Sequence, residues 1–110
     1  MTNNLKRKTQ KDIGDTFTSV DGYIVPSSTQ VTIIGLTVAN TYVNNIEIDI
    51  VVNDGVEDTY IVKTAPVPVG SSLVAIGGEQ KVVLEPGDSV RVKSNYINSA
   101  DVIMSIMETT

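Results

Sequence analysis

The sequence has 110 residues and a formal net charge of −5 at pH 7, a length that fits one domain with its own core. It contains no cysteine and no histidine. These absences exclude disulfides, thiolate metal sites and catalytic pairs of serine or cysteine with histidine. We expect neither enzymatic activity nor a bound cofactor or metal ion.

Charge is distributed unevenly along the chain. Residues 1–11 carry four basic side chains and no acidic one, whereas the remainder holds four basic and thirteen acidic side chains, a net charge of −9. We predict that residues 1–12 form a basic, extended arm and that residues 13–110 form one domain. The arm is expected to lie on an acidic surface of a neighbouring subunit through Lys6, Arg7, Lys8 and Lys11.

Two other interpretations of this arm were weighed. A segment with so few apolar residues is also typical of a disordered tail. A basic cluster can also bind phosphates, but the acidic body would repel them, so we do not expect contact with nucleic acid. No run of residues approaches the roughly 20 apolar side chains of a membrane span, so membrane contact is not expected either.

Two strands are expected before residue 41. The first begins directly after the arm, and the second covers residues 30–40. Within the second strand, we expect Ile34, Leu36 and Val38 to share one face. Gly35 interrupts that strand and indicates either a bulge or a close approach of another backbone.

The middle of the chain gives the clearest strand pattern. Residues 45–53 place Ile46, Ile48, Ile50 and Val52 on one face and Glu47 and Asp49 on the other, as a half-buried antiparallel strand does. Asp54 and Gly55 then indicate a hairpin. In the returning segment, Pro66 and Pro68 lack a backbone N–H, which favours a sheet edge or a crossing between sheets over a central strand.

The last third of the chain continues the strand pattern. Gly77 and Gly78 predict a hairpin between short apolar runs at 73–76 and 81–85. Residues 101–109 fit either a strand or a short helix, and the surrounding pattern favours the strand. About eight short strands with turns between them predict an antiparallel β-sandwich that resembles a jelly roll.

Some aliphatic side chains fall on faces that alternation assigns to solvent. They are either ordinary surface residues or part of a subunit interface. These candidate interface residues are Val51, Val83, Ile103 and Met107.

Two groups of acidic residues were considered as sites and set aside. Asp54, Glu57 and Asp58 share one predicted turn but lack the spacing of a calcium loop. Glu47 and Asp49 share a strand face, but no aromatic surface for sugar accompanies this carboxylate pair. The simpler interpretation is that both groups are solvated.

Four segments of the chain carry a family resemblance, namely 33–40, 60–74, 77–90 and 101–105. They resemble small virion structural proteins of tailed bacteriophages, particularly phages of aquatic bacteria. The similarity covers residues 13–108 and leaves the basic arm outside it. The resemblance implies a β-sandwich subunit of a virion without enzyme activity, and it carries over no functional residue.

The sequence therefore favours a capsid decoration or cement subunit in a virion. Such a subunit would bind copies of itself and the major capsid protein or other virion structural proteins. One alternative is a structural component of the tail, neck or fibre. Another is a glycan-binding module for host attachment, in which Tyr42 and Tyr96 in predicted loops would supply aromatic surface.

Overall fold

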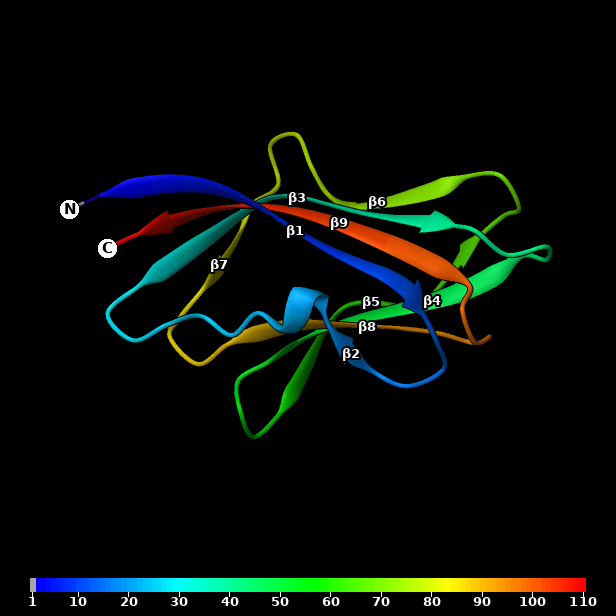
Figure 1. Cartoon of the computed structure of the whole chain (residues 1–110), viewed down its shortest axis with the longest axis horizontal. Helices are drawn as coiled ribbons and strands as arrows, with labels where there is room; N and C mark the ends of the chain where they lie inside the picture. The colour runs from blue at the N-terminus through cyan, green and yellow to red at the C-terminus, as the bar shows by residue number, and fades with distance from the viewer. Residues whose placement is uncertain (1) are drawn as a thin grey trace.

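The computed structural model describes residues 2–110 as two antiparallel sheets stacked on each other (Figure 1). Sheet A, the upper layer in Figure 1, has the strand order β1-β9-β3-β6, and β7 also pairs with β3. Its strands are β1 (Asn3–Ile13), β3 (Gln30–Asn40), β6 (Ser72–Ile76), β7 (Val82–Leu84) and β9 (Ala100–Thr109).

Sheet B forms the lower layer and has the strand order β2-β8-β4-β5. A single 3-10 turn, η1 (Val20–Gly22), lies between β2 and β3 along the described chain. The strands of sheet B are β2 (Thr18–Ser19), β4 (Ile46–Asn53), β5 (Asp58–Val67) and β8 (Ser89–Ser94).

The chain crosses repeatedly between the two sheets. β1 leads to β2, β2 to β3 and β3 to β4, each time from one sheet to the other, and the same holds from β5 to β6, β7 to β8 and β8 to β9. Two packed sheets joined in this way form a jelly roll. The predicted antiparallel, jelly-roll-like β-sandwich is therefore confirmed.

The described residues form nine strands, one more than expected, because β1 (residues 3–13) and β2 (residues 18–19) replace the single strand that was predicted to begin after the arm. Two short strands share one position in sheet A. β6 pairs with β3 at residues 36–39, and β7 pairs with β3 at residues 31–33. The predicted hairpin at Gly77 and Gly78 is therefore wrong, because these glycines lead from β6 to β7 along the same partner strand. The loop between them is the excursion at the top of Figure 1.

A bulge near Gly35 changes which side chains of β3 face the core. The pairing with β9 shifts register between Ile33 and Gly35. As a result, Ile33 and Leu36 are both fully buried, while Ile34 is only partly buried. A bulge was one of the two alternatives expected at Gly35. The expectation that Ile34 shares a face with Leu36 and Val38 is wrong, because the extra residue reverses the alternation.

The core is an aliphatic layer between the sheets. Ile46, Ile48 and Ile50 of β4 face it and are buried, as the alternation predicted. β9 is a strand, not a helix, and buries Met104 and Ile106 in the same layer. Each fully buried side chain of this size stabilises the fold by roughly 1.5–3 kcal/mol.

The N-terminal segment is part of the sandwich. Residues 3–13 are extended, as expected, but they form β1, which pairs with β9 of the same chain from Asn3↔Thr109 to Ile13↔Ala100. The expected boundary between residues 12 and 13 therefore falls inside β1, which is a strand of sheet A. Sequence composition could not show this, because a strand held by backbone pairing needs few apolar side chains of its own.

The two ends of the chain lie together at the left of Figure 1. The N–H of Thr2 donates to the carbonyl of Thr110 at 3.0 Å, and the reverse bond is 2.9 Å. Among residues 2–110, no helix is long and apolar enough to cross a membrane.

Candidate assembly surface

The outer face of sheet A carries exposed aliphatic side chains from four strands. Residues directly opposite each other on paired strands point to the same face. Leu5 of β1 lies opposite Met107 of β9, and Thr37 of β3 lies opposite both Ile103 and Val74. The exposed fractions are 75% for Leu5, 65% for Val74 and 53% for both Val83 and Ile103. We call this surface the sheet A face, defined by Leu5, Val74, Val83, Ile103 and Met107.

Three of the four predicted interface residues lie on this face. Val83 and Ile103 are exposed, and Met107 is partly buried among its neighbours. The fourth, Val51, requires a correction, because it lies in sheet B and is fully buried. Its cross-strand neighbours are Tyr60 and Arg91, whose long side chains leave a valine between them no exposed surface.

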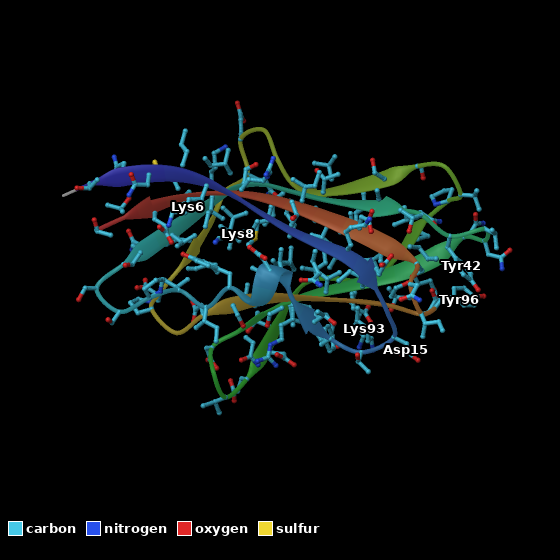
Figure 2. The ribbon with its side chains drawn as sticks, viewed as in Figure 1. Lys6, Lys8, Asp15, Tyr42, Lys93 and Tyr96 are labelled. Carbon is cyan, nitrogen blue, oxygen red and sulfur yellow. The ribbon has the colours of Figure 1, made fainter. Side chains whose placement is uncertain are left out.

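A cluster of polar side chains holds β1 against the rest of the fold. The Lys6 ammonium lies 2.8 Å from a carboxylate oxygen of Glu108, and the Tyr23 hydroxyl donates a hydrogen bond to the same carboxylate. The Lys8 ammonium lies 4.7 Å from the centre of the Tyr23 ring and 3.9 Å from a carboxylate oxygen of Asp21. Figure 2 shows Lys6 and Lys8 at successive positions along β1. We call Lys6, Lys8, Asp21, Tyr23 and Glu108 the β1 polar cluster.

Hydrogen bonds and burial together determine the electrostatics of this cluster. Glu108 is only 6% exposed. Hydrogen bonds from Lys6 and then from Tyr23 nevertheless hold the pKa of the Glu108 carboxyl below its usual value. Burial, followed by the hydrogen bond to Glu108, raises the pKa of the Tyr23 phenol. The cluster therefore contains a charged carboxylate and a neutral phenol at physiological pH.

The four predicted arm cations are divided between two faces of β1. Lys6 and Lys8 lie opposite Ile106 and Met104, so they share the inner face of sheet A. Arg7 lies opposite Ser105 on the outer face, and Lys11 is exposed at the bulge that ends the strand. The sequence pattern did not show this division, because residues 3–13 were not expected to form a strand. It also did not show the contacts of Tyr23 and Glu108, which are distant in the chain from Lys6 and Lys8.

The β4–β5 hairpin projects from sheet B as the green loop at the bottom of Figure 1 and ends in acidic side chains. The Asp54 carboxylate accepts the N–H of Glu57 at 2.7 Å and of Val56 at 2.9 Å, and these bonds lower the pKa of Asp54. The Asn53 amide donates to Asp58 at 2.7 Å. The hairpin predicted at Asp54 is thus confirmed, and its turn is fixed by its own side chains.

The apex of this hairpin is apolar. Val56 is 89% exposed, and it stands between Asp54 and the carboxylates of Glu57 and Asp58. Within residues 2–110, no group of three or more metal-ligating side chains is arranged to hold an ion. The hairpin therefore presents a valine flanked by negative charge.

The loops at the right-hand end of Figure 2 bring the two candidate glycan-binding tyrosines together. The rings of Tyr42 and Tyr96 stack with centroids 4.7 Å apart and an interplanar angle of 24°. The backbone N–H of Tyr42 also donates to Asn40, whose amide donates to the carbonyl of Val67. Each tyrosine therefore packs one face of its ring on the ring of the other. The pair joins the β3–β4 loop to the β8–β9 loop.

A polar hollow of about 210 Å³ lies on sheet B and includes both members of the predicted carboxylate pair. Glu47 and Asp49 line it together with Asp15 and Lys93. Asp49 accepts the N–H of Thr64 at 2.6 Å and lies 3.5 Å from the Lys93 ammonium. Asp49 therefore helps to hold the edge strand β5 against β4. Pro66 also lies in this edge strand, as predicted.

Comparisons with known proteins identify the fold. No protein-family model matches the chain, and neither does any curated protein. A protein of Bacillus endospore appendages, which form disulfide-linked pili, has a TM-score of 0.57 and 17% identity over 99% of this chain and 88% of its own. Two structures of a pentameric capsid protein from metagenomic phage sequences have a TM-score of 0.42 and 21% identity. They cover 91% of this chain and 59% and 60% of their own. The appendage protein supports the fold alone.

Proposed function

We propose that this chain is a structural subunit of a virion and that it decorates and stabilises the capsid shell. The observation that carries this proposal is the sheet A face, where four aliphatic side chains on one continuous sheet are more than half exposed. An apolar area gathered on one face, rather than scattered, is typical of an interaction surface. The resemblance of the chain to phage virion proteins is the reason that we propose a virion as the place of assembly.

β1 contributes to this surface as a fixed strand with charged side chains. Lys6 and Lys8 of the β1 polar cluster hold the strand. Arg7 lies on the opposite face of β1, and Lys11 is exposed at the bulge. Arg7 and Lys11 are therefore the side chains of the predicted arm that would bind acidic groups of a neighbouring copy or of the major capsid protein. Many such contacts, repeated by symmetry, add up to a stable shell.

The association of copies is tested by the mass of the protein in solution as its concentration is raised. Deleting residues 1–11 would remove a strand of the sandwich, so substitutions are the sharper test. Ile103→Lys changes the sheet A face, and Ile97→Lys is the control because Ile97 is similarly exposed but lies in the β8–β9 loop. We expect the wild type and Ile97→Lys to associate and Ile103→Lys to remain at the monomer mass of 11.8 kDa. A monomeric wild type, or equal association of both variants, overturns the proposal.

Two other functions are tested separately. A tail, neck or fibre component would use the same surface, so imaging the neighbours of this chain in particles distinguishes capsid proteins from portal or tail proteins. The stacked Tyr42 and Tyr96 favour glycan binding as the second candidate, because Tyr96 is 38% exposed and an exposed aromatic ring can pack on sugars. A glycan array without hits, compared with Tyr42→Ala and Tyr96→Ala proteins, would remove that candidate.

A further inference from the structure

We propose that the sheet A face of one copy binds the β4–β5 hairpin tip of a second copy. This inference rests on the proposed function and specifies which part of the partner makes the contact. It concerns the contact between copies of this chain, not the contact with the shell.

The sheet A face offers positive charge beside its apolar surface. Lys6, Lys8 and Lys93 each form an ion pair inside the molecule. Arg7 and Lys11 form none within residues 2–110, and Arg7 shares the outer face with Leu5 and Ile103 through its register with β9. A partner for this surface must combine an apolar group with carboxylates.

The hairpin tip has that combination. Val56 is almost completely exposed, and the carboxylates of Glu57 and Asp58 follow it directly. The internal hydrogen bonds of Asp54 fix the turn before it binds, which reduces the entropy lost on docking. Val56 can pack on the aliphatic side chains while Arg7 binds a carboxylate through two parallel hydrogen bonds.

The other surfaces fit the hairpin less well. The hollow on sheet B is lined by Asp15, Glu47 and Asp49, and its Lys93 is already paired with Asp49. The loops around Tyr42 and Tyr96 expose apolar side chains, but their residues 41–45 and 95–99 include no cation. Of the three surfaces compared, charge complementarity therefore favours the sheet A face, which combines Arg7 with exposed aliphatic side chains.

The arrangement of the two surfaces determines the kind of assembly. The hairpin projects from the sheet B layer, and the face covers the outer side of sheet A, so they lie on opposite sides of the sandwich (Figure 1). A chain cannot place its own tip on its own face. Contact between copies is then head-to-tail, which produces a ring if the rotation closes and a filament if it does not.

Two variants separate this contact from other modes of association. Arg7→Glu removes the cation from the face and leaves the tip intact, whereas Val56→Ser changes the tip and leaves the face intact. Val43→Ser is the matched control, because Val43 is a similarly exposed valine in the β3–β4 loop. The concentration dependence of mass is measured by light scattering for each protein and for an equimolar mixture of Arg7→Glu and Val56→Ser.

We expect Val56→Ser and Arg7→Glu each to associate at least about tenfold more weakly than the wild type, and Val43→Ser to be unchanged. The mixture should form one-to-one dimers, because an intact tip on one variant meets an intact face on the other. If the wild type associates and Val56→Ser does so equally, or the mixture gains nothing, this inference is overturned while the proposed function stands. A wild type that stays monomeric at every concentration overturns both.

Discussion

Replacing Glu108 tests whether the β1 polar cluster holds the N-terminal strand in place. In Glu108→Ala, the part-buried Tyr23 hydroxyl loses a charged acceptor, a bond worth roughly 1.5–3 kcal/mol. The Lys6 side chain is 47% exposed and can return to water, so its ion pair adds at most about 1 kcal/mol. We therefore expect the free energy of unfolding to fall by roughly 2–4 kcal/mol in Glu108→Ala.

Glu108→Gln is the matched variant, because its amide oxygen still accepts a bond from Tyr23. It should lose only about 1 kcal/mol of stability. Both values come from denaturant unfolding at neutral pH, with amide hydrogen exchange in β1 as the local measurement. A loss below about 0.5 kcal/mol for Glu108→Ala, or equal losses for the two variants, would show that backbone pairing alone holds β1.

The same cluster predicts a dependence on pH. The pKa of Glu108 is lowered in the folded state, so its contribution is present above its unfolded pKa of about 4.3. That contribution is lost as the pH falls through the lower, folded-state pKa. The stability difference between the wild type and Glu108→Gln should therefore disappear in acid, and a constant difference across that range would contradict the assignment.

Three further predictions concern the core and the turns. Ile106→Ala should reduce stability by about 2–5 kcal/mol in thermal or denaturant unfolding, whereas Ile103→Ala on the same strand should cost less than about 1 kcal/mol, because only Ile106 is buried. Gly87→Ala should lower stability by about 1 kcal/mol, since φ is +91° there, whereas Gly14→Ala should be tolerated because the nearest heavy atom to its added Cβ is 3.7 Å away. Asp54→Ala should speed amide exchange in the hairpin turn, and Asp54→Asn should not, because the asparagine retains an acceptor oxygen.

Local patterns predicted most of the sandwich. The alternation from Ile46 to Ile50 identified β4, and the proline at position 66 marked an edge strand, because both signals depend on neighbours along the chain. Ile34 shows the limit of such reasoning. Gly35 indicated either a bulge or a close approach of another backbone, and the sequence did not show which of the two is present or where the alternation reverses.

The candidate surface depended on contacts that sequence patterns do not contain. Lys6 and Lys8 resembled a free basic arm, yet their partners Glu108 and Tyr23 are distant in the chain and meet them only in the folded sheet. Val51 looked solvent-facing by alternation, but residues of two neighbouring strands bury it. In contrast, Ile103 was correctly predicted to lie on the outer face of its strand, because buried and exposed residues alternate along β9 without interruption.

The most direct test of the account is a dilution series of ¹⁵N-labelled protein observed by NMR, which a chain of 11.8 kDa permits. If copies associate as proposed, concentration-dependent shifts will cluster in two places. These are the sheet A face around Arg7 and Ile103, and the hairpin tip around Val56. Shifts confined to the loops of Tyr42 and Tyr96, or spectra that do not change with concentration, would contradict the claim that this sandwich assembles through sheet A.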